Sequence, residues 1–82
     1  MSFGPPELIR HILDEIDFVI DRSAGLDECA FMRDPTVQRA FIRSLEIIGE
    51  AVKKLPPDFR AAHGDIPWKR MAGLRDRLIH DY

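Results

Sequence analysis

The sequence has 82 residues, of which 45% are hydrophobic and 32% charged, and its formal net charge is −2. This length fits one small domain with a thin core, and the composition excludes a disordered chain. The longest apolar runs, such as Phe18-Val19-Ile20, are too short to cross a membrane, and the net charge excludes a basic, general nucleic-acid-binding surface over the whole molecule.

The first third of the chain predicts a long amphipathic helix, because its apolar residues recur at helical spacing. The stripe consists of Leu8, Ile12, Ile16 and Val19 or Ile20, flanked by Ile9 and Leu13. Pro5-Pro6 mark the start of this helix, and Gly25 is a natural C-terminal cap that ends it near residues 22–25. Residues 26–32 have room for a short helical turn.

Asp34-Pro35 is a strong start signal for a second long helix, because an acidic N-cap residue precedes a proline at the first helical position. Its apolar stripe is Val37, Phe41, Leu45, Ile48, Val52 and Leu55, and Pro56-Pro57 close it. Gly49 in mid-helix predicts the close approach of another backbone. On another side, Arg43, Glu46 and Glu50 are either a solvent-exposed face or a polar wall beside a cleft.

The last third of the chain predicts a connector over residues 58–64 and a final helix that starts at Asp65-Ile66-Pro67-Trp68. Trp68 could stack on a base, but its place on an apolar stripe favours the core. No hairpin signal or alternation typical of strands occurs in the sequence. We therefore predict an all-α fold, an antiparallel helical bundle in a single domain that spans residues 1–82.

Charge is unevenly distributed along the chain. Residues 7–21 contain five acids and one base, whereas residues 67–82 contain two acids and four bases, namely Lys69, Arg70, Arg75 and Arg77. If RNA or phosphate binds, the C-terminal segment is the better candidate.

Residues 75–82, Arg-Asp-Arg-Leu-Ile-His-Asp-Tyr, hold the residues best suited to chemistry. On a helix, Asp76 and His80 lie one turn apart, so the carboxylate can fix the imidazole tautomer for proton transfer. Arg75 offers a guanidinium shaped for phosphate, but it lies about 140° around the helix from His80. Either Arg75 reaches around the helix, or two copies of the helix meet. Without further information, a solvated salt-bridge face is the commoner meaning of such a pattern.

Three blocks of the sequence resemble the HepT-like branch of the HEPN proteins. The segment 75–82 is similar to that branch's Arg-x-x-x-x-His-x-Tyr signature. Leu45-Glu46-Ile47-Ile48-Gly49-Glu50-Ala51 resembles its "Leu-Glu-Ile-Ile-Gly-Glu-Ala" helix, and Ile66-Pro67-Trp68 resembles the approach to its signature helix. Because the blocks keep their order and spacing, the resemblance covers nearly the whole chain.

The resemblance implies a helical bundle that forms a homodimer, in which two signature helices line one cleft. It also implies RNA cleavage without a metal or other cofactor, in a toxin of a toxin–antitoxin pair. His80 would transfer protons, Arg75 would hold the phosphate, and Asp76 would orient or polarise His80. Tyr82 would be the residue that a minimal nucleotidyltransferase antitoxin modifies with AMP. Three further charged residues are candidates for lining this cleft: Arg43, Glu50 and Arg77.

Relatives in that branch continue past the tyrosine with about one more helix, so we expect a bundle truncated after the signature helix. The alternative function is a non-catalytic binding or regulatory partner of the nucleotidyltransferase. Cys29 cannot form an internal disulfide, and the N-terminus lacks the features of a signal peptide, so we expect a cytoplasmic protein. With only acids beside it, Cys29 is expected to be a buried or half-buried thiol.

Overall fold

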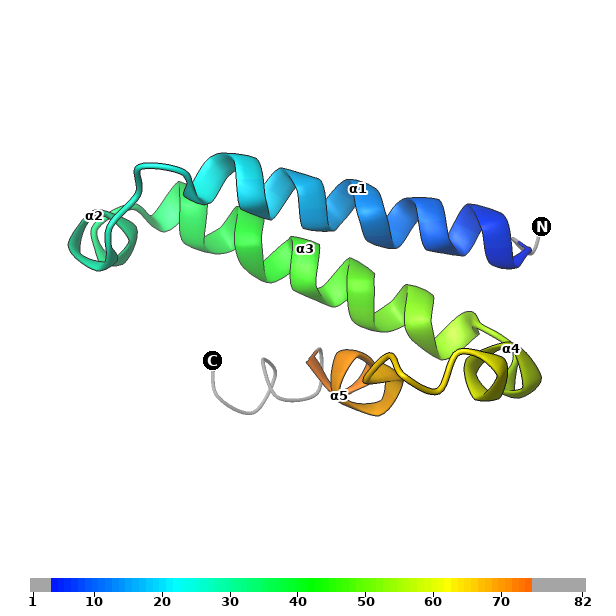
Figure 1. The fold of residues 1–82 in the computed structure, drawn as a ribbon. Coiled ribbons are helices and arrows are strands. Elements are labelled where there is room, and N and C mark those ends of the chain that lie inside the picture. Colours follow the sequence, from blue (N-terminus) through cyan, green and yellow to red (C-terminus); the bar gives the residue numbers. More distant parts are fainter. Residues whose placement is uncertain (1–3, 75–82) are drawn as a thin grey trace.

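Two long helices form the centre of the computed structural model, which describes residues 4–74. α1 spans Pro5–Ser23 and α3 spans Pro35–Lys54, and the two lie side by side in opposite directions (Figure 1). Three short helices complete the described part, α2 (Glu28–Met32), α4 (Pro57–Ala62) and α5 (Trp68–Ala72). Residues 4–74 contain no strand, so the predicted all-α fold is confirmed.

The ends of the two long helices are set by the local signals that the sequence contains. An oxygen of the Asp34 carboxylate accepts hydrogen bonds from the backbone N–H groups of Thr36 at 3.1 Å and Val37 at 3.2 Å. These bonds satisfy two donors that the first turn of a helix leaves without an intrahelical partner. After α1 ends, Gly25 adopts a φ of +74°, a left-handed conformation that favours glycine. Both predicted boundaries are therefore confirmed.

The short helix α2 closes one end of the α1–α3 pair. The side-chain amide of Gln38 on α3 donates to the backbone oxygen of Phe31 at 2.8 Å, which ties α2 to α3. Phe41 of α3 packs against two other rings, with centroid distances of 5.6 Å to Phe31 and 6.3 Å to Phe18. Apolar and aromatic contacts thus hold the turn between the two long helices in place.

The hydrophobic core lies toward the α4 and α5 end of the long helices. Its buried members come from α1, from the second half of α3 and from α5: Leu8, Ile12, Ile48, Ala51, Val52, Leu55 and Trp68. Gly49 is also buried within α3. α5 lies along the side of α3 away from α1 (Figure 1), so α3 is the middle layer of the described structure.

The apolar stripe predicted for α1 is buried only in its first half. Leu8 is 2% exposed and Ile12 4%, whereas Leu13 is 53% exposed and Ile20 62%. Of the two residues offered as the end of the stripe, Val19 is half-buried and Ile20 is exposed, and the flanking Leu13 is exposed as well. In the second half of α1, Phe18 packs against Phe41 of α3, and a contact between two helices covers a narrower stripe than a contact among three helices does.

Two further predictions are wrong. Residues 58–64 are not a simple connector, because Pro57–Ala62 form α4 with a proline in the first turn. A helix of six residues is too short to produce a readable apolar period. Cys29 is exposed rather than buried, since α2 is a single short helix that presents its outer side to solvent.

Candidate active site

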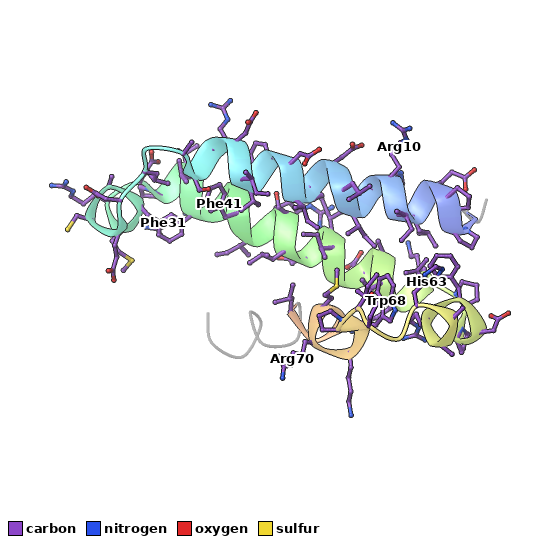
Figure 2. All side chains as sticks on the ribbon, in the orientation of Figure 1. Arg10, Phe31, Phe41, His63, Trp68 and Arg70 are labelled. Atoms are coloured by element: carbon purple, nitrogen blue, oxygen red, sulfur yellow. The ribbon has the colours of Figure 1, made fainter. Side chains whose placement is uncertain are left out.

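The start of the predicted signature helix is anchored to the core by Trp68. The Trp68 side chain is 8% exposed, and its indole Nε1 donates to the backbone oxygen of His63 at 3.0 Å. The Trp68 ring also lies 6.4 Å from the ring of Phe59 on α4, measured between centroids. Figure 2 shows Trp68 between α5 and the C-terminal end of α3. The expectation that Trp68 belongs to the core is confirmed.

The rest of the described part of this segment continues the contact with α3. Met71, Ala72 and Leu74 are partly buried against the core cluster. The backbone N–H of Met71 donates to Pro67 at 3.1 Å, and that of Gly73 donates to Lys69 at 3.1 Å. The chain is therefore held against α3 up to Leu74, the residue that directly precedes Arg75.

The residues predicted to carry the chemistry follow at once in the sequence. Arg75, Asp76, Arg77, His80 and Tyr82 all lie outside the described residues 4–74. Their roles stay predictions from the sequence. What the structure adds is the placement of the residues that lead into them.

Two of the predicted cleft-lining residues, Arg43 and Glu50, lie on α3. They are seven residues apart and so share one side of the helix, two turns from one another. A nitrogen of Arg43 lies 3.8 Å from a carboxylate oxygen of Glu46, with 66% of the Arg43 side chain exposed. An ion pair this exposed contributes little to stability, so packing does not require these residue types. The prediction that they line a cleft is untested.

Arg43 also borders a depression between the two long helices. The other residues around it are Glu15 and Phe18 of α1 and Ala40 and Ser44 of α3. Arg43 is thus positioned near the α1 side of α3, where it faces an acidic neighbour as well as solvent. Arg43 does not border the second depression, which lies on α5 and is described next.

A basic depression on α5 was not singled out by the sequence reasoning. It has a volume of about 610 Å³ and is lined by Pro67, Lys69, Arg70, Gly73 and Leu74. The sequence indicated only that this segment, which includes Lys69 and Arg70, is the better candidate for binding RNA or phosphate. The available signal was the spacing, because residues 69, 70 and 73 fall on one side of a helix.

The described residues contain neither a candidate metal cluster nor a candidate membrane span. Within residues 4–74, no group of three or more His, Cys, Asp and Glu side chains is arranged to hold a metal ion. None of the helices described is both long enough and apolar enough to span a membrane.

Comparison with known proteins identifies the family. The family model described as "Ribonuclease HepT-like" matches residues 12–82, which include the whole segment from Arg75 to Tyr82. This chain belongs to the HepT-like ribonuclease family. The resemblance inferred from the three sequence blocks is thereby confirmed. The predicted enzyme class, an endoribonuclease, is also the class of this family.

Several relatives are similar over most of this chain. A protein of Caldanaerobacter subterraneus subsp. tengcongensis named "Putative RNase" is 54% identical over 78 residues, which cover 95% of this chain and 70% of the relative. A "Probable ribonuclease HepT" of Thermococcus cleftensis is 56% identical over 82 residues, which cover 100% of this chain and 74% of the relative. A "Putative RNase" of Methanocaldococcus jannaschii is 50% identical over 76 residues, covering 93% of this chain and 60% of the relative.

The chain spans 59–61% of the length of three relatives from Methanocaldococcus jannaschii. No solved structure matches the chain.

Proposed function

We propose that this chain is a metal-independent endoribonuclease and the toxin of a toxin–antitoxin pair. The observation that carries the proposal is the family match, which runs through residue 82 and so includes Arg75, His80 and Tyr82 at the signature spacing. The anchoring of Trp68 and Leu74 supports it, because a catalytic segment needs a fixed base.

The reaction we propose is attack by a ribose 2′-oxygen on the adjacent phosphorus. The new bond is 2′-O–P, the bond between phosphorus and the 5′-oxygen breaks, and the products carry a 2′,3′-cyclic phosphate and a 5′-hydroxyl. His80 transfers protons in this step, and Asp76 orients or polarises the imidazole of His80. Arg75 holds the phosphate and neutralises the charge that builds up on its oxygens.

A homodimer explains how Arg75 and His80 act on one phosphate. The two residues lie about 140° apart around a single helix, so one helix cannot readily aim both at one atom. Two signature helices that face one another across a cleft bring an arginine and a histidine together from different protomers. Arg43, Glu50 and Arg77 are the further charged residues proposed to line this cleft.

The proposed antitoxin is a minimal nucleotidyltransferase that attaches AMP to Tyr82. The added phosphate would compete with RNA for Arg75 and repel an RNA backbone, so inhibition would require no change of fold. RNA is the proposed substrate class, and tRNA is the first RNA to test.

The deciding experiment is RNA cleavage by the purified chain in the presence of EDTA, with His80→Ala as the comparison. We expect wild type to produce 2′,3′-cyclic phosphate ends and His80→Ala to lose a factor of about 10²–10⁴ in rate, with an unchanged circular dichroism spectrum. Equal cleavage by both proteins, or cleavage only with a divalent metal, would contradict the mechanism. Tight binding to the nucleotidyltransferase without any cleavage would favour a non-catalytic regulatory partner.

A further inference from the structure

α5 has one side against the core and one basic side in solvent. Trp68 and Ala72 are turned toward the core cluster, whereas Lys69 and Arg70 are both exposed. Figure 2 shows Arg70 projecting from α5 on the side away from α3. We call Lys69 and Arg70 together the basic surface.

The basic surface borders the depression of about 610 Å³ on α5. Gly73 lies on the same side and leaves the depression open, because it has no side chain. A Cβ built on Gly73 would meet only backbone oxygens, of Lys69 at 3.5 Å and of Arg70 at 3.6 Å, which is ordinary contact. Pro67 and Leu74 contribute apolar edges. The depression therefore combines two cations with apolar walls.

Within residues 66–74, Lys69 and Arg70 have no acidic neighbour in the sequence. Residues 66–74 contain no Asp or Glu, and within the part of the chain that the structure describes no ion pair joins Lys69 or Arg70 to a carboxylate. The acids gather instead on α1, where Asp14, Asp17 and Asp21 are exposed. α1 and α5 lie on opposite sides of α3 (Figure 1), so these three acids are separated from the basic surface by α3.

We propose that the basic surface binds the phosphate backbone of a single-stranded RNA substrate. Arginine and lysine are the residues that contact phosphates most readily, and the apolar edges at Pro67 and Leu74 suit a ribose or a base. Leu74, which lines the depression, is next in sequence to Arg75. The proposal rests on the proposed ribonuclease function, and it assigns to Lys69 and Arg70 a role in substrate binding, separate from the chemical step.

The test separates binding from cleavage by using an RNA that cannot be cut. The probe is a fluorescent single-stranded RNA of 2′-O-methyl nucleotides, and its anisotropy reports the Kd at several salt concentrations. For Lys69→Ala/Arg70→Ala, we expect the Kd to rise about 10- to 30-fold at 0.1 M salt. The slope of log Kd against log salt should fall by about 1.4, because each lost phosphate contact removes about 0.7.

The matched control is Arg10→Ala/Arg22→Ala on α1. It removes two positive charges from exposed positions of α1, a helix that lies across α3 from α5 (Figure 1). We expect its Kd to stay within about twofold of wild type. A second variant, Gly73→Leu, fills the depression without changing the charge, and should weaken binding while leaving the salt slope unchanged.

Cleavage kinetics on an ordinary RNA complete the test. Lys69→Ala/Arg70→Ala should raise KM by the same factor as the Kd and leave kcat near the wild-type value. Wild-type Kd and KM in this variant would overturn the inference while leaving the ribonuclease proposal intact. If wild type binds the probe through Lys69 and Arg70 but cleaves nothing, the inference stands and the ribonuclease proposal fails. Absence of binding by wild type would overturn the inference.

Discussion

The indole N–H of Trp68 donates to the backbone oxygen of His63, 3.0 Å away, and so links α5 to the end of α4. This bond fixes α5 at the point where the chain turns from α4 along the side of α3. The acceptor is a main-chain oxygen, so the bond depends on the identity of Trp68 and not on that of His63.

Trp68→Phe should therefore lower the free energy of unfolding by about 1 kcal/mol, because the hydrogen bond from the indole is lost while most of the buried ring area remains. The His63 oxygen keeps its other donor, the backbone N–H of Ile66 at 3.1 Å. The melting temperature should fall by about 4–8 °C for each kcal/mol in a chain of this size. The measurement is thermal unfolding followed by circular dichroism at fixed protein concentration. His63→Ala is the control and should preserve this bond. A Trp68→Phe variant as stable as wild type would show that the bond contributes nothing.

Asp34→Ala should lower the free energy of unfolding by about 1 kcal/mol, because the first turn of α3 loses the acceptor of two backbone N–H groups. Asp34→Asn should retain most of the stability, since the amide oxygen can accept the same bonds. Urea denaturation measures both variants. Asp17→Ala, which removes an exposed acid that caps no helix, should change stability by less than about 0.5 kcal/mol. Equal losses in Asp17→Ala and Asp34→Ala would exclude the cap as the cause.

Arg75→Ala should reduce the rate of the RNA cleavage step by about 10²–10³, as loss of a charge-stabilising donor typically does. Arg75→Lys should recover only part of this loss, because an ammonium group cannot make the two parallel hydrogen bonds of a guanidinium. Single-turnover cleavage at saturating protein gives the rate of the chemical step. Full activity in Arg75→Lys would mean that positive charge alone is required.

Tyr82→Phe should fold and cleave RNA, but resist silencing by a nucleotidyltransferase antitoxin, because it lacks the hydroxyl that accepts AMP. Mass spectrometry after incubation with the antitoxin and ATP should show AMP-sized additions on wild type alone. Neutralisation of Tyr82→Phe to the same extent as wild type would place the control at another residue.

Predictions that depend on neighbouring residues in the sequence are correct, whereas predictions that depend on contacts with distant parts of the chain are less accurate. Asp34-Pro35 and Gly25 were interpreted correctly because capping and left-handed turns depend on a few neighbouring residues. Pro57 carried the same kind of signal for α4, but Pro56-Pro57 was interpreted only as the end of the preceding helix. The exposure of Ile20 and Cys29 depends on what packs against them from elsewhere in the chain, which spacing does not encode.

The candidate site divides in the same way. Trp68 could be assigned to the core because it lies on an apolar stripe. From the sequence, Lys69 and Arg70 could be named as part of the segment better suited to binding RNA or phosphate, but the depression that they border could not be predicted. The pairing of Arg75 with His80 from a second chain depends on an interface, and a single sequence does not specify which surfaces meet.

The burial pattern of α5 also predicts how this part of the molecule opens. Among residues 4–74, Trp68 is the one buried core side chain that follows Leu55 in the sequence. Detaching α5 therefore exposes far less apolar surface than separating α1 from α3 does, and its free energy of opening is lower than that of global unfolding. In hydrogen exchange, the amides of Met71 and Gly73 should lose protection together, well before that of Val52. We therefore expect the segment that leads into Arg75 to open as a unit of its own, with a free energy below that of global unfolding, while the pair of long helices stays folded.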